Sequence, residues 1–282
     1  MKQMTITQTK QKSRPSPREI IADIRDSDDF REAMQDGKPL SHAFSVAAEA
    51  LAELETTESG RRTPEGHAYA LVGQIFDVAS SAQVLRSKHL TPEAKIPHKR
   101  RLIRFNHELR AMVDAYQDLS PQEVHRMLIE PYIAIARSGW SSDEQARQEV
   151  GAITEEVDTI MFGMWGEING EMIVGAAGYE IDTDVTEDDE LKGIDDWVHM
   201  QPDLGDNYGW MPIDFKGSAE KARQVNNLHP NNRAVWSQLS HAEFKRARTF
   251  RIPPQLAQAK SGAMRRQLEE LYTNGTLANT PL

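Results

Sequence analysis

The chain contains no cysteine among its 282 residues, and this absence limits its chemistry. Disulfide bonds, thiolate metal ligands and cysteine nucleophiles are all excluded. A chain without cysteine fits a reducing compartment, so we expect a cytoplasmic location. No run approaches the ~18 apolar residues that a membrane span needs, and the N-terminus has no apolar segment typical of a secretory signal. The sequence therefore predicts no membrane partner.

Positive charge is also scarce, because the formal net charge is −10. This balance argues against a protein that coats nucleic acid, although the local field decides whether a site can bind phosphate. Local basic clusters lie at 98–104, 245–251 and 265–266. Each cluster could contact phosphates, and each is also typical of a solvated helix face. With 39% hydrophobic and 27% charged residues, the chain has the composition of an ordinary globular protein.

The pattern of residues divides the chain into four regions and predicts an α+β fold. Residues 1–18 are polar and basic and predict a flexible tail. Residues 19–140 are helical almost throughout, residues 141–272 contain the predicted strands, and residues 273–282 form a second tail. Nothing in the helical region chooses between substrate engagement, dimerisation and simple packing.

Two signals mark helix ends in the helical region. Ser16 and Pro17, followed by Glu19, predict an N-cap with proline at the first helical position. A second helix is expected to begin at Ser120 and to end or kink at Pro131.

The second half is predicted to contain a helix, several strands and further helices. An apolar stripe predicts a helix over 141–165, followed by a turn at 166–170. The further expected elements are a strand at 171–181, an acidic connector at 182–192, strands at 194–200 and 210–215 joined by a hairpin loop, a helix at 219–227, a helical or mixed segment at 234–246, a strand at 249–252 and a helix at 255–272. Pro212 predicts that its strand starts there or lies at an edge.

The two hairpin strands carry the most informative side chains. Alternation along the second strand places Asp214 and Lys216 on one face, opposite Ile213. A further acid, Asp195 or Asp196, opens the neighbouring strand. Two carboxylates from adjacent strands can hold Mg²⁺, and a lysine beside them can position or deprotonate a water for attack on phosphorus.

Gly193-Ile194-Asp195, followed by Ile213-Asp214-Phe215-Lys216, resembles the motif of the PD-(D/E)XK nuclease superfamily. The resemblance covers about residues 145 to 230. It implies a restriction-endonuclease-like core, in which an acid-bearing helix, a small mixed or antiparallel sheet and a second helix follow one another. It also implies that Asp195, Asp214 and the backbone carbonyl of Phe215 bind the metal and that Lys216 is the catalytic lysine. No proline precedes Asp195, unlike in many members, and the adjacent Asp196 is an alternative ligand.

Members of the superfamily often carry a further acid on the helix before the sheet. On the predicted helix, Glu156 borders the apolar stripe, so it is the candidate for this third, catalytic acid. A solvated glutamate at the edge of an apolar face is the structural alternative.

The acid-x-Lys triple is not specific by itself, because it occurs five times in the chain. Only the copy ending at Lys216 follows an apolar strand with another acid upstream. Glu190 and Lys192 offer an alternative register, but their surroundings lack strand character. A solvated connector is the simpler interpretation of that acidic run.

These patterns predict a Mg²⁺-dependent endonuclease, with Mn²⁺ as an alternative metal and DNA as the partner. A restriction enzyme and a phage or repair nuclease fit equally, and a homodimer is compatible with either. The alternatives are a non-catalytic nucleic-acid-binding protein and a helical assembly protein in which 193–218 is only a structural hairpin. The predicted nucleic-acid contacts are Lys221, Arg223, Lys245, Arg246 and Arg248.

Overall fold

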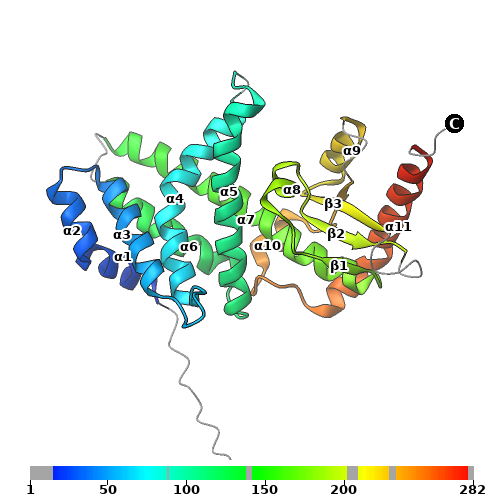
Figure 1. Ribbon diagram of the computed structural model, residues 1–282, viewed down its shortest axis with the longest axis horizontal. Helices are drawn as coiled ribbons and strands as arrows, with labels where there is room; N and C mark the ends of the chain where they lie inside the picture. The colour runs from blue at the N-terminus through cyan, green and yellow to red at the C-terminus, as the bar shows by residue number, and fades with distance from the viewer. Residues whose placement is uncertain (1–14, 88, 138–141, 202–208, 229–232, 279–282) are drawn as a thin grey trace, which may run out of the picture.

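The computed structural model of the protein describes residues 15–87, 89–137, 142–201, 209–228 and 233–278. About 70% of it is helical, and the rest includes one small four-stranded sheet. Figure 1 shows helices α1–α6 on one side of the molecule and the sheet with its helices on the other. The elements are α1 (Pro17–Asp26), α2 (Asp28–Gln35), α3 (Leu40–Leu54), α4 (Pro64–Arg86), α5 (Pro92–Ala115), α6 (Pro121–Ala136), α7 (Asp143–Ala176), β1 (Glu180–Asp182), α8 (Glu187–Leu191), β2 (Asp196–His199), β3 (Trp210–Lys216), α9 (Ala219–Leu228), β4 (Ala234–Trp236), α10 (His241–Arg246) and α11 (Pro254–Ala278).

The predicted start of the first helix is confirmed. Ser16 caps α1, and its hydroxyl accepts from the backbone amide of Glu19 while the Glu19 carboxylate accepts from the backbone amide of Ser16. Of the two outcomes expected at Pro131, an end or a kink, the end is wrong, because α6 runs through Pro131 to Ala136. Ile129 and Ile135 are both buried on either side of the proline. This packing offsets the hydrogen bond that the proline removes.

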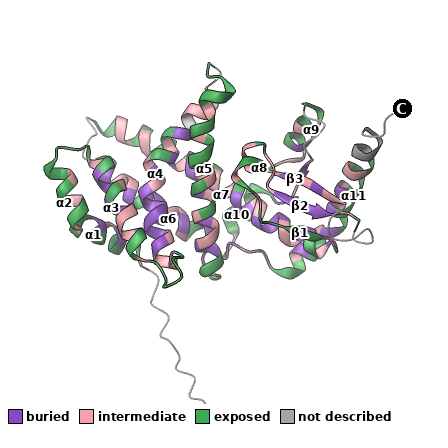
Figure 2. Cartoon of the chain, viewed as in Figure 1, coloured by how far each residue is buried: buried purple, intermediate pink, exposed green. Residues whose placement is uncertain are grey.

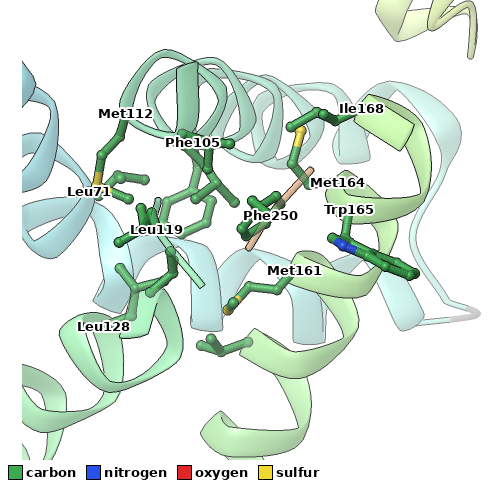
Figure 3. Packing of buried hydrophobic residues seen from close by; sticks show 14 of the residues in the cluster. Leu71, Phe105, Met112, Leu119, Leu128, Met161, Met164, Trp165, Ile168 and Phe250 are labelled. Carbon is green, nitrogen blue, oxygen red and sulfur yellow. The ribbon is translucent and has the colours of Figure 1, made fainter. Parts of the chain in front are cut away.

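Helix α7 connects the two halves of the molecule and is longer than predicted. The expected turn at 166–170 and the strand beginning at 171 are wrong, because α7 continues to Ala176 and only Glu180–Asp182 forms a strand. Glycine inside a helix costs about 1 kcal/mol, which burial of a long apolar face outweighs. The face of α7 shown in Figure 3 packs Met161, Met164 and Ile168 among side chains from the helical half.

The buried hydrophobic residues form one cluster that extends through both halves. In Figure 2, buried positions follow the strands and the inner sides of the helices, whereas α2 contains none. The helical half and the sheet therefore share a core instead of having one each.

The sheet has the order β1-β2-β3-β4 and is mixed. β1, β2 and β3 pair antiparallel, while β4 runs parallel to β3 after the crossover through α9. The two predicted hairpin strands are confirmed as β2 and β3, and residues 202–208 of their connector lie outside the described residues. Pro212 neither starts its strand nor lies on an edge strand. On one side Pro212 pairs with Trp197 of β2. On the other side β4 pairs only with Asp214–Lys216, so no neighbouring strand requires a backbone N–H from Pro212.

The last third of the chain differs in two places. The predicted strand at 249–252 is not one, because its backbone groups bond elsewhere: the buried side chain of Asn169 bonds Phe250 O at 2.9 Å and Ile252 N at 2.7 Å, and the Phe250 amide donates to Leu119 O. The C-terminal helix ends at Ala278, six residues beyond the predicted end, so the proposed tail at 273–282 is partly helical. The helix after Lys216 is confirmed as α9. Of the N-terminal tail, residues 1–14 lie outside the described residues.

These elements confirm the α+β class, with a helical first half and a small mixed sheet in the second. None of the helices that the structure describes has both the length and the apolar character required to cross a membrane.

Candidate functional site

The predicted acids meet where β2 begins and β3 ends. Asp195 directly precedes β2, and its backbone amide donates to Ile213 O at 2.9 Å. Its carboxylate in turn accepts from the backbone amide of Phe215 at 2.6 Å. These two hydrogen bonds fix Asp195 across the end of β3.

Asp214 and Lys216 complete the group on the same face of β3. Asp214 is 4% exposed, and its Oδ1 accepts from Nζ of Lys216. The carboxyl groups of Asp214 and Asp195 also share a hydrogen bond. Two acids and one amine from adjacent strands are therefore in direct contact.

Burial raises the pKa of Asp195 well above its usual value, and the nearby carboxylates of Glu167 and Asp214 raise it further. The amine of Lys216 and the Phe215 amide act in the opposite direction. Burial likewise raises the pKa of Asp214 against the opposing effect of Lys216. Because like charges are crowded here, at least one proton or one cation stabilises the group.

The third acid is Glu167, supplied by α7. Burial and the charges of Asp196 and Glu171 raise its pKa to about 8. Glu156, the predicted candidate, is also buried, but it lies eleven positions earlier on the same helix. At 1.5 Å per residue this separation is about 16 Å along the axis. The structure therefore brings Glu167, and not Glu156, to Asp195.

Asp196 lies behind this group on the opposite face of the sheet. It pairs with Ile213, which shares its face with Phe215, and the Phe215 ring packs against Gly170 of α7. Asp196 is 0% exposed, and among the described residues neither of its oxygens has a hydrogen-bond partner. Burial, Glu171 and Asp195 raise its pKa to about 9. Of the two adjacent acids, Asp195 is thus the one that contacts Asp214.

A half-buried ion pair between α5 and α7 lies beside Asp196. Arg110 on α5 donates two hydrogen bonds to Glu171, at 2.6 and 2.5 Å, and its Nη1 is 3.7 Å from Glu167. The positive charge of Arg110 lowers the pKa of Glu167 and of Asp196 and so partly offsets the effect of burial. Such a two-pronged arginine contact fixes orientation as well as charge.

A cavity of about 460 Å³ opens next to the acids, between α5, α7 and the segment that includes α8. Its lining includes Glu167 and Asp195 as well as His107 and Arg110 from α5. Glu190 of α8 also lines the cavity, and its Oε1 is hydrogen-bonded to Nε2 of His107 at 2.7 Å. The helical half is therefore part of the wall of the site.

The alternative register with Glu190 and Lys192 is not assembled in the same way. Both residues belong to the α8 segment, which is helical, and Lys192 contacts Asp189.

The predicted nucleic-acid contacts fall into two places. Lys221 and Arg223 are exposed on α9, which begins three residues after Lys216. Lys245 and Arg246 lie on α10, with Arg248 just beyond it, and Lys245 pairs with Asp158. Asp158 precedes Glu167 by nine positions on α7, or about 14 Å along the axis. Arg223 lines a separate cavity formed with β4 and α11, so neither group is placed against the acids.

The set of donors suits a hard divalent cation, which prefers carboxylate and carbonyl oxygen. In a strand, the N–H and C=O of one residue point to the same neighbour, so the Phe215 carbonyl points toward Asp195, as its amide does. Within the described ranges, no three acidic or histidine side chains already surround one point as metal ligands. Instead, the carboxyl groups of Asp195 and Asp214 are hydrogen-bonded to each other, and Asp214 also accepts from Lys216.

We compared the chain with models of known protein families, with curated proteins and with solved structures, and no significant match was found in any of the three. The site is therefore interpreted from its own geometry.

Two residues of the site were missed by the sequence patterns. Glu167 fell within the predicted turn at 166–170, because two glycines there suggested a helix end. The spacing of Glu167 and Glu171, four residues apart on one helix face, was the available signal. Arg110 is far away in the sequence, and only the docking of α5 on α7 reveals it.

Proposed function

We propose that the protein is a metal-dependent endonuclease that hydrolyses phosphodiester bonds of DNA. The observation that carries this proposal is the direct contact of Asp195, Asp214 and Lys216 at the shared end of β2 and β3. The order of elements supports it, since an acid-bearing helix (α7), three antiparallel strands (β1, β2 and β3, with the short α8 after β1), a helix (α9) and a parallel strand (β4) follow one another. This order agrees with the restriction-endonuclease-like core that the motif implies.

The residues present fit a Mg²⁺ ion, and Mn²⁺ accepts the same oxygen ligands. Asp195, Asp214 and the Phe215 carbonyl would hold the metal, and Glu167 would assist directly or through water. When bound, the metal polarises the phosphate and stabilises the charge that develops on its oxygens. Because the acids have raised pKa values, they release protons as a cation binds.

Lys216 has a separate role. Its ammonium contacts Asp214 and is 28% exposed, so it lies at the border between the acids and solvent. From this position it donates a hydrogen bond to a water and orients that water toward phosphorus. The Phe215 amide keeps Asp195 in place during the reaction, because its hydrogen bond favours the ionised carboxylate.

The proposal is tested by incubating purified protein with supercoiled plasmid. Wild-type protein is expected to nick or linearise the plasmid with Mg²⁺ and to stop when EDTA is added. The Asp214→Asn variant is expected to lose cleavage while it keeps its circular dichroism spectrum. Intact plasmid and intact single-stranded DNA under all metal conditions would overturn the proposal. DNA binding that is indifferent to EDTA and to Asp214→Asn would then favour the non-catalytic alternative.

A further inference from the structure

The first half of α5 carries a concentration of positive charge that is unusual for this acidic chain. Between residues 92 and 104, five lysines and arginines accompany one acid, Glu93, although the whole chain has a net charge of −10. Arg100, Arg101 and Arg104 are all exposed. We refer to these three arginines as the α5 basic face.

Two of the three arginines, Arg100 and Arg104, lie on the side of α5 that lines the cavity beside the acids, and Arg101 lies about a quarter of a turn further round the helix. Residues 103, 106, 107 and 110 line the cavity at helical spacing, and Arg100 lies one turn before the first of them on the same side of the helix. A ligand that lies along α5 is therefore guided toward Glu167 and Asp195. In Figure 1, the first turns of α5 project beyond the body of the molecule, and α8 lies beside the middle of the helix.

Within the protein itself, Arg100 and two of its neighbours on α5 already contact oxygen atoms of the α8 segment. Nε of Arg100 is 2.6 Å from Oε1 of Glu187 on α8, and Nζ of Lys99 is 3.4 Å from the backbone oxygen of Leu191. Further along the same side of α5, His107 contacts Glu190. The carboxylates of Glu187 and Glu190 on α8 thus occupy positions from which an oxygen atom can bind Arg100 and His107 on α5.

These α8 contacts are weak enough to be exchanged. The side chains of Arg100 and Glu187 are 48% and 38% exposed, and exposed ion pairs contribute little to stability. Arg101 and Arg104 form no ion pair within the described residues, so their charges remain available to a ligand. A chain of phosphates binds several cations at once and gains from the release of its counterions, which a single carboxylate does not.

We propose that the α5 basic face is the surface on which duplex DNA lies as it enters the site, and that the α8 carboxylates hold phosphate positions until DNA replaces them. This inference rests on the proposed nuclease function and assigns the helical half its role: it binds the DNA backbone. Because the contacts are to phosphates, they are independent of sequence.

The test is fluorescence anisotropy with a fluorescein-labelled duplex about two helical turns long, in EDTA so that no cleavage occurs, over a range of salt concentrations. The variant Arg100→Gln/Arg101→Gln/Arg104→Gln is compared with Lys38→Gln/Arg61→Gln/Arg126→Gln. The second set removes the same charge from exposed side chains elsewhere in the helical half. Glutamine is a good helix former, so both sets preserve the helices.

The α5 variant is expected to bind at least about tenfold more weakly at ~0.1 M salt, and the salt slope is expected to fall by about 2 to 3 units, close to one per lost contact. The matched control is expected to retain the wild-type slope. The Glu187→Gln variant is expected to bind up to about fivefold more tightly, because Arg100 no longer has a competing carboxylate. Equal losses in both triple variants, no loss in either, or weaker binding by Glu187→Gln would each overturn the inference.

This result is separable from that of the cleavage assay. Duplex binding that depends on α5 without any cleavage in Mg²⁺ would refute the nuclease and support the DNA surface. Cleavage with unchanged binding by the α5 variant would refute the DNA surface alone.

Discussion

The backbone amide of Phe215 donates a 2.6 Å hydrogen bond to the side chain of Asp195, twenty residues earlier in the chain. This one contact joins the end of β3 to the start of β2 and places both acids of the motif side by side. The Phe215 ring on the other face packs against Gly170 of α7. The position of the site therefore depends on close packing between α7 and β3.

Replacing Gly170 with alanine should disturb this packing. The added Cβ would lie less than 3 Å from atoms of the Phe215 ring, so the ring, the strand or the helix must shift. We expect the free energy of unfolding to fall by about 1–3 kcal/mol, as for other overpacked cores. Urea unfolding measures the loss, and cleavage should weaken with it.

Gly163→Ala is the matched control on the same helix. No atom lies within 4 Å of its added Cβ, and the position is exposed. It should stabilise the protein by about 0.5–1 kcal/mol, the usual difference between glycine and alanine in a helix. Equal effects of the two substitutions would contradict the proposed contact.

Glu167 and Glu156 can be distinguished by the same substitution. Glu167→Gln should lower the cleavage rate at limiting Mg²⁺ by about 10- to 100-fold, in the range found for residues that support a metal site. Glu156→Gln should leave the Mg²⁺ dependence of the rate close to that of wild type, because it lies three turns away. The measurement is initial cleavage rate against Mg²⁺ concentration. A larger defect in Glu156→Gln would restore the sequence-based prediction.

The stability of the metal-free protein should decrease as pH rises. The pKa is about 8 for Glu167 and about 9 for Asp196, against about 4 for such groups in an unfolded chain. The folded protein therefore holds protons that the unfolded chain has lost, and this advantage is complete below about pH 4 and disappears as pH passes 9. Between pH 5 and 9 we expect the free energy of unfolding to fall by a few kcal/mol.

Thermal unfolding in EDTA at several pH values tests this profile. Asp196→Asn should flatten the decline, since it removes the acid with the higher pKa. Asp188→Asn, an exposed acid on α8, should leave it unchanged. Stability that rises over this range would show that these acids are ionised in the folded protein.

Arg110→Ala should be destabilising, because it leaves the half-buried carboxylate of Glu171 without its partner. Removing one partner of a fully buried pair costs about 3–5 kcal/mol, and we expect a smaller loss of about 2–3 kcal/mol for this half-buried pair. In the double variant Arg110→Ala/Glu171→Gln the cost should be smaller, since no unpaired charge is left behind. Urea unfolding at pH 8 measures both. Additive losses would exclude direct coupling between the two side chains.

The sequence predicted much of what depends on local pattern. The cap at Ser16, the two hairpin strands and α9 each follow from the residues in the segment itself. Asp214 and Lys216 share a face because strand alternation requires it. These features need no knowledge of the rest of the chain.

What could not be predicted depends on contacts between distant segments. Glycines at 166 and 170 suggested a helix end, but packing against β3 extends α7 to residue 176. The segment at 249–252 has strand character, yet Asn169 satisfies its backbone. The third acid and Arg110 become part of the site only when α5 and α7 dock, and no spacing rule in the sequence encodes that geometry.

The most direct test of the central claim is the rate at which Lys216→Ala protein nicks supercoiled plasmid at saturating Mg²⁺. Removing the amine should reduce the rate by about 100-fold or more, because the attacking water loses the hydrogen bond that orients it. DNA binding in EDTA should stay intact, because the acids and the DNA-binding surface remain. Cleavage by Lys216→Ala at the wild-type rate would contradict the account, and the contact of Asp195, Asp214 and Lys216 would then be structural only.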